Sequence, residues 1–218
     1  TKTIFNGYEY ITTTLLMMAV PFIYYSVAER LAWERFLKQG ITIATGAGFA
    51  LLVSFCILCF QIAAVTGSLS DGLTHIKLSL QKRSYADPDQ FRADFKKSLQ
   101  SPPLPVVLKY LEGSFFEVDL PADLQQPQLT LRVSYAALIL FFTLMSLVAY
   151  RYSKNCPDPR SFALLVACWF SLCAPLSWFI IFKAHSYIHG HLNFIVWQMP
   201  FTLFGSAVSG AAIKNLFS

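Results

Sequence analysis

Five long apolar stretches, separated by polar segments, dominate the hydrophobic pattern of this chain. A helix needs about 20 apolar residues to cross a bilayer, and each stretch comes near that length. The pattern therefore predicts an all-α, polytopic membrane protein with about five transmembrane helices and a mostly helical extracytoplasmic loop. The predicted spans are residues 11–27, 41–65, 133–150, 162–182 and 194–213.

These spans divide the chain into three parts. Residues 1–65 hold the first two transmembrane helices and their cytoplasmic connector. Residues 66–132 form the extracytoplasmic loop, where the spacing of apolar residues predicts helices separated by proline-containing turns. Residues 133–218 hold three further transmembrane helices, with a histidine-rich outer turn between the last two.

Small residues indicate where two of the spans pack. Gly46 and Gly48 lie in the second span, and Gly205, Ser209 and Gly210 lie in the fifth. Small side chains let helix backbones approach closely inside a membrane. We therefore expect both spans to contact other helices through these faces.

Composition supports the membrane class and narrows the partners. Of the 218 residues, 55% are hydrophobic and 13% are charged, and this charged fraction is about half that of soluble proteins. A soluble domain of this size cannot bury so much apolar surface. The net charge of +5 comes largely from short loops, so we expect membrane lipids as partners and no nucleic acid.

Basic residues in the short connections predict the orientation. By the positive-inside rule, the side that carries them faces the cytoplasm. The N-terminus, the long loop and the histidine-rich turn then lie outside and the C-terminus lies in the cytoplasm, as expected for a bacterial inner-membrane protein. The basic residues on the cytoplasmic side are Arg30, Arg35, Lys38, Arg151, Lys154, Arg160 and Lys214.

The best candidate for chemistry is a polar cluster between the fourth and fifth spans. His185 and His189 are four residues apart and share one face if the segment is helical. Backbone amides at the start of the fifth span favour an anion at the same point. The cluster therefore predicts a lipid-phosphate site, to which the basic start of the outer loop also contributes. Its predicted residues are Lys183, His185, His189, His191, Asn193, His75, Lys82 and Arg83.

Two other interpretations of the cluster remain open. Three histidines, His185, His189 and His191, are enough for an open catalytic zinc site, although no carboxylate lies nearby in sequence as a further ligand. No cofactor is predicted, and a divalent metal is the alternative. Trp178, Tyr187 and Trp197 fit an interfacial aromatic belt, in which the histidines act only as polar anchors.

Two regions of the sequence resemble a known family. The first joins residues 21–25 to residues 33–37 by a basic amphipathic loop and continues through Gly67-Ser-Leu-Ser-Asp-Gly-Leu-Thr-His75. The second joins Pro175-Leu-Ser-Trp178 to the histidine cluster. Together they resemble the C-terminal membrane half of bacterial glycosyltransferases of the GT-C class, which use polyprenyl-phosphate sugars.

This resemblance implies sugar transfer from a lipid-phosphate donor at the outer face. It also implies a catalytic carboxylate in the first outer loop of a full-length enzyme, where this chain offers only Glu9. The catalytic residues are therefore unassigned, and the predicted function is part of such a transferase. A non-catalytic subunit of a larger membrane complex and a histidine-based metal or proton-handling protein are the alternatives.

Overall fold

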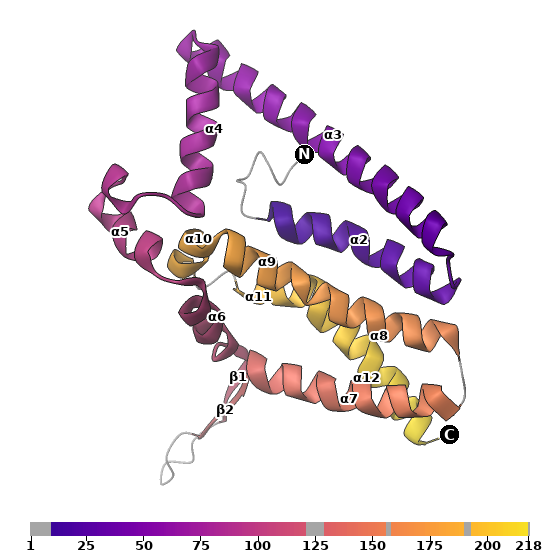
Figure 1. Ribbon diagram of the computed structural model, residues 1–218. Helices are drawn as coiled ribbons and strands as arrows, with labels where there is room; N and C mark the ends of the chain where they lie inside the picture. Colours follow the sequence, from indigo (N-terminus) through magenta and orange to yellow (C-terminus); the bar gives the residue numbers. More distant parts are fainter. Residues whose placement is uncertain (1–9, 121–128, 156–157, 190–192, 218) are drawn as a thin grey trace.

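The computed structural model describes residues 10–120, 129–155, 158–189 and 193–217, and these residues are almost entirely helical, as predicted (Figure 1). In chain order the elements are α2 (Ile11–Ala28), α3 (Trp33–Thr66), α4 (Leu69–Arg83), η1 (Pro88–Gln90), α5 (Ala93–Gln100), α6 (Pro103–Leu111), β1 (Ser114–Leu120), β2 (Leu129–Ser134), α7 (Tyr135–Asn155), α8 (Pro159–Ser171), α9 (Cys173–Ile181), α10 (Lys183–Ile188), α11 (Asn193–Trp197), η3 (Gln198–Thr202) and α12 (Leu203–Leu216).

Four helical segments of the described chain are long and apolar enough to cross a membrane. They are α2, α3, Tyr135–Ser153 of α7, and Pro159–Ile181, which joins α8 and α9. This count corrects the prediction of five spans, because the predicted fifth span is divided into α11, the π-helical η3 and α12.

Proline chemistry explains the division of the fifth stretch. Pro200 lies inside η3, and its ring has no N–H to donate and crowds the preceding turn. The helix widens there into a π turn, as helices do where the regular hydrogen-bond ladder is interrupted. The Thr202 hydroxyl donates to the Trp197 carbonyl at 3.1 Å, which satisfies one carbonyl of the widened turn.

The tightly packed part of the molecule is a bundle in which α2 packs along α8 and α9, and α12 packs against α7 and α8. Gly205 of α12 lies so close to Phe142 of α7 that a β-carbon at this position would overlap the ring. Ser209, one turn later, is also buried. The predicted packing face is confirmed at these two residues, whereas Gly210 is exposed and a β-carbon there would meet nothing.

Helix α3 stands apart from this bundle. Figure 1 shows it diverging from α2 beyond their shared turn, and its far end packs against α4. Of its 34 residues, only Ser54 and Cys59 are buried. A β-carbon at Gly46 or Gly48 would meet nothing within 4 Å. Within the described chain, the predicted small-residue face of this span therefore has no helix partner.

The segment between α3 and α7 forms a cap on one end of the bundle. Its predicted helices are confirmed as α4, α5 and α6. Pro88 lies in one of the predicted proline-containing turns, as the first residue of η1, and there the Asp87 side chain accepts from the Asp89 N–H at 3.1 Å. The cap also contains an antiparallel hairpin, β1–β2, which the sequence analysis did not predict.

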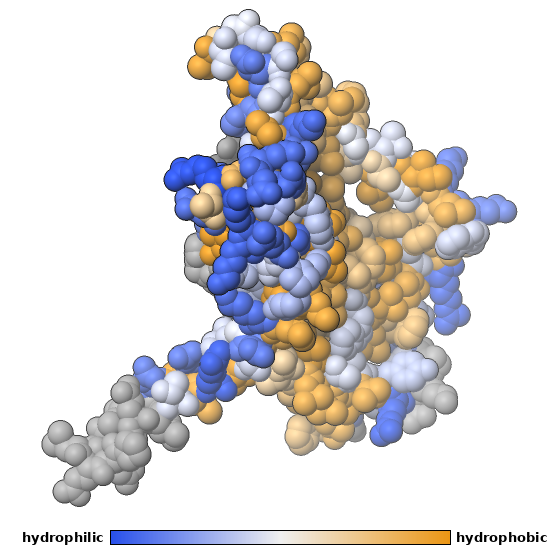
Figure 2. Space-filling view, turned by 60° about the vertical axis from the view of Figure 1, so that its left-hand side comes forward, coloured by the Kyte–Doolittle hydropathy of each residue, from blue (hydrophilic) through white to orange (hydrophobic). Residues whose placement is uncertain are grey.

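The hairpin has two chemically different faces. Its register pairs Val118 with Leu131 on one face and Glu117 with Arg132 on the other. Alternation of apolar and polar residues is the usual pattern of a half-exposed strand. Figure 2 shows the hairpin as an arm that projects from the rest of the molecule.

The bundle has two distinct ends. The turn between α2 and α3, the end of α7, the start of α8 and the end of α12 lie together (Figure 1). We call this the basic end, because these segments carry the basic residues predicted to face the cytoplasm. We call the opposite end, which holds α10 and the cap, the histidine end.

Candidate functional site

Helix α10 carries the described part of the histidine cluster. The helix is interrupted at Phe182, which lies between α9 and α10. Helix α10 packs against α4, α5, α6 and α9. His185 lies within α10, and His189 ends it by donating its backbone N–H to the His185 carbonyl at 3.1 Å. The cluster is therefore held between the bundle and the cap.

The structure brings two of the predicted site residues together. The ring centroids of His185 and His189 lie 4.4 Å apart, with 40° between the ring planes. Both side chains are half-buried. We call them the imidazole pair. Their helical spacing places them on one face of α10, as the sequence predicted.

Two other members of the predicted cluster are less fully described. His191 lies outside the described residues, as does Glu9, and Asn193 is described as the first residue of α11. Among the residues that the structure describes, no group of three His, Cys, Asp or Glu side chains is arranged to hold a metal ion. The three-histidine metal site includes His191, so it stays a prediction.

Lys183 is placed differently from the predicted site. Its side chain is buried, and its ammonium group donates to the carbonyls of Leu99 at 2.8 Å and Ser101 at 2.7 Å. The same nitrogen lies 4.9 Å from the centroid of the Tyr85 ring. Burial lowers the pKa of Lys183. Two of its three N–H donors thus tie α10 to the end of α5, which gives this lysine a positioning role.

The basic residues of α4 lie at different distances along the helix from α10. A hydrogen bond holds the end of α4 near α10. The hydroxyl of Tyr85, just after α4, donates to the carbonyl of Ile180, near the end of α9, at 2.8 Å. Lys82 lies over the Phe95 ring, 3.8 Å from its centroid, and Arg83 donates to the Ser79 carbonyl at 3.0 Å. His75 is exposed and about 12 Å further back along the helix axis.

A buried aromatic cluster lies beneath the imidazole pair. Trp178 is the link, since its ring centroid lies 6.5 Å from that of His185 in an edge-on arrangement. Trp178 and Trp197 are 0% and 1% exposed. The prediction that these tryptophans anchor the chain at the membrane surface is therefore wrong. They pack in the core because Tyr110 of the cap helix α6 contacts Trp178 and Tyr135 of α7 stacks on Trp197, contacts that local sequence does not encode.

Four polar atoms in this aromatic cluster lack a hydrogen-bond partner in the described chain. They are the hydroxyl groups of Tyr110 and Tyr135 and the indole N–H groups of Trp178 and Trp197. A buried donor without a partner costs about 1–3 kcal/mol. Sequence analysis did not identify Tyr110 or Tyr135, and no sequence motif marks them.

Comparison with known proteins adds no family to this description. No protein-family model matches the chain, and no curated protein or solved structure shows a significant match to it. Two adjacent imidazoles offer hydrogen-bond donors, and each gains a positive charge when protonated. This arrangement suits an anionic group.

Proposed function

We propose that this chain is part of an integral membrane glycosyltransferase that binds a lipid-phosphate-linked sugar donor at the extracytoplasmic face. The main support is the imidazole pair, whose ring centroids lie 4.4 Å apart at one end of a set of candidate membrane spans. Lipid phosphates lie at this depth, where spans meet water. The likeness of the sequence to GT-C enzymes supplies the reaction class.

The two ends of the bundle support the orientation. The basic end matches the side of a membrane protein that remains in the cytoplasm. The histidine end then faces outward in a bacterial inner membrane. The broken segment from α11 through η3 to α12 returns the chain to the basic end (Figure 1), so in this proposal the C-terminus is cytoplasmic and the N-terminus is outside. A polyprenyl-phosphate sugar presented in the outer leaflet would reach the imidazole pair from this side.

In this mechanism the imidazole pair stabilises the negative charge of the departing lipid phosphate. Sugar transfer breaks the bond between the sugar and its lipid phosphate, so negative charge develops on the departing phosphate. The ring N–H groups of His185 and His189 would donate hydrogen bonds to its oxygens and stabilise that charge. Lys82 and Arg83, at the end of α4, would add positive potential. His191 and Asn193 remain predicted contacts, and the catalytic carboxylate is unassigned.

The test measures binding of polyprenyl phosphate to the full chain in lipid nanodiscs. Replacing both His185 and His189 by Ala should weaken binding by about 100-fold or more, because each hydrogen bond to a charged group contributes about 1.5–3 kcal/mol and two are lost. Lys97→Ala is the control, since Lys97 is an exposed basic residue of the cap outside the predicted site. Equal binding by the double variant and the control would refute the proposal.

A second function has an observation of its own. Helix α3 exposes large apolar side chains along its length, including Phe49, Leu52 and Phe60 at 60% or more. Its open glycine face would accept a helix from another subunit. An accessory subunit would therefore bind its partner through α3. Purification in mild detergent would then yield a defined complex that a Gly48→Leu variant loses, while polyprenyl phosphate binding would be absent.

A further inference from the structure

A pocket of about 400 Å³ lies at the basic end of the bundle. Three candidate spans meet the membrane surface there, since two of them end at Ala28 and Ser153 and a third begins at Pro159. We call it the charged pocket. Its lining includes Val27, Arg30, Tyr150, Ser153, Asp158 and Phe162. A ligand bound here would therefore lie at the depth of lipid headgroups.

Arg30 occupies an unusual backbone position in the turn between α2 and α3. Its φ of 50° is left-handed, a region in which most side chains are strained and glycine is favoured. Strained residues of this kind cluster at binding and active sites. Among the described residues, no ion pair or side-chain hydrogen bond involves Arg30. Its guanidinium group is therefore available to a ligand in the charged pocket.

Asp158 supplies a carboxylate to the same pocket and caps the start of α8. One of its oxygens accepts from the Arg160 N–H at 3.1 Å, and the other accepts from the Ser161 N–H at 3.1 Å and the Ser161 hydroxyl at 2.7 Å. The hydrogen bonds from Ser161 and Arg160 lower the pKa of Asp158, so this group is negatively charged at neutral pH. A carboxylate has about four acceptor positions, which leaves one for a ligand.

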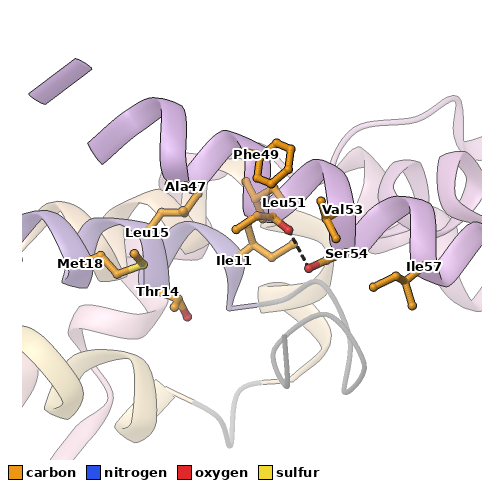
Figure 3. A pocket seen from close by; sticks show the side chains of 11 residues that line it. Ile11, Thr14, Leu15, Met18, Ala47, Phe49, Leu51, Val53, Ser54 and Ile57 are labelled. Carbon is orange, nitrogen blue, oxygen red and sulfur yellow. Dashed lines mark hydrogen bonds between the residues drawn. The ribbon is translucent and has the colours of Figure 1, made fainter. Parts of the chain in front are cut away.

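The charged pocket thus offers one positive and one negative group. Arg30 and Asp158 form no ion pair with each other within the described chain, so each can contact a different charge of one ligand. A zwitterion matches this arrangement, whereas a simple anion would be repelled by Asp158 and a simple cation by Arg30. The groove between α2 and α3 differs, because none of its eleven lining side chains is charged (Figure 3).

Lipid-facing side chains adjoin the charged pocket. Tyr150 and Phe162 line it and also line the apolar surface between α7 and α8, together with Leu147. All three side chains are exposed and belong to candidate spans. A zwitterion in the charged pocket would therefore lie beside the hydrocarbon of the bilayer, which suits the headgroup of a phospholipid better than a soluble metabolite.

We propose that the charged pocket binds the phosphoethanolamine headgroup of a phospholipid in the leaflet at the basic end. Arg30 and the Ser153 hydroxyl donate to the phosphate oxygens, and Asp158 accepts from the ammonium group. An ethanolamine ammonium has three N–H donors, as a lysine side chain does, whereas a choline ammonium has none. Asp158 therefore selects ethanolamine over choline.

The test measures lipid binding to the full chain in detergent by native mass spectrometry. The probes are phosphatidylethanolamine, phosphatidylcholine and phosphatidylglycerol with identical acyl chains. Phosphatidylethanolamine should bind about tenfold more tightly than phosphatidylcholine, because one charge-assisted hydrogen bond at a partly solvated site distinguishes them. Asp158→Asn should remove this preference while α8 keeps its start, since Asn caps a helix as well as Asp does.

Two further variants separate the guanidinium group from general positive charge. Arg30→Gly should weaken binding of the ethanolamine and choline lipids about tenfold, because both carry the phosphate. A φ of 50° suits glycine, so the turn should keep its shape. Arg151→Gln is the matched control, since Arg151 is an exposed basic residue at the same end outside the pocket lining, and it should change neither affinity.

Three results would overturn the proposal. The first is equal affinity of the unaltered chain for the ethanolamine and choline lipids. The second is a preference for phosphatidylglycerol that falls equally with Arg30→Gly and Arg151→Gln, since basic residues attract anionic lipids in general. The third is a loss of thermal stability in Arg30→Gly and Asp158→Asn without any change in lipid binding, which would show that the two residues act on each other.

The charged pocket and the imidazole pair lie at opposite ends of the bundle, so their tests are independent. Arg30→Gly should leave polyprenyl phosphate binding unchanged. Replacing His185 and His189 by Ala should leave the affinity for phosphatidylethanolamine unchanged.

Discussion

Helices α3 and α8 are both parts of candidate spans, yet their surroundings differ completely. In α8, five of 13 residues are buried against neighbouring helices. In α3, two of 34 are buried. Both sequences are apolar, because lipid and protein interior demand the same side chains. The comparison shows that apolarity places a residue in the membrane but does not say whether it faces lipid or protein.

The largest expected effect tests this contrast with two glycines. Gly205→Ala would force its new β-carbon into the buried Phe142 ring, and we expect the free energy of unfolding to fall by about 2–3 kcal/mol. Gly48→Ala adds the same methyl group to the open face of α3, where it meets nothing, and should raise stability by about 0.5–1 kcal/mol because Ala is the better helix former. Unfolding by denaturing detergent, followed by circular dichroism, measures both.

Similar losses from the two glycine variants would mean that α3 is packed in the membrane as tightly as α12 is. A helix partner from outside the described chain would then be required. That result would favour the accessory-subunit function.

The next effect concerns the connection between the cap and the bundle. Lys183→Met removes both donors to the carbonyls of Leu99 and Ser101 and leaves these groups unsatisfied, so we expect a loss of about 2 kcal/mol. Hydrogen exchange of the α5 amides should accelerate accordingly. Lys97→Met, on an exposed face of α5, should leave exchange unchanged. Unchanged exchange in both variants would show that Lys183 is free to contact a ligand instead.

The smallest effect compares two tyrosines of the cap region. Burial raises the pKa of Tyr110, and its hydroxyl has no partner in the described chain. Tyr110→Phe should therefore raise stability by about 1 kcal/mol. Tyr85→Phe removes the hydrogen bond to the Ile180 carbonyl and should lower stability by a similar amount. A loss with Tyr110→Phe would reveal a bound water or ligand at that hydroxyl.

The helical class and the cap helices were predictable, because their signals are local. The spacing of His185 and His189 also predicted the imidazole pair. The position of Lys183 was not predictable, because its carbonyl partners come from another part of the chain. The hairpin does carry a local signal in the sequence, since Phe116 and Val118 alternate with Glu117 and Asp119, as in a strand.

The π turn at η3 also sets the rotational phase between α11 and α12. Each residue of a helix advances the chain by about 100°, so a one-residue deletion within Gln198–Thr202 would turn α12 about its axis and move Gly205 away from Phe142. A substitution at Met199, whose side chain is exposed, leaves that phase intact. The length of this short segment is therefore a stronger constraint on the bundle than the chemistry of its exposed side chains.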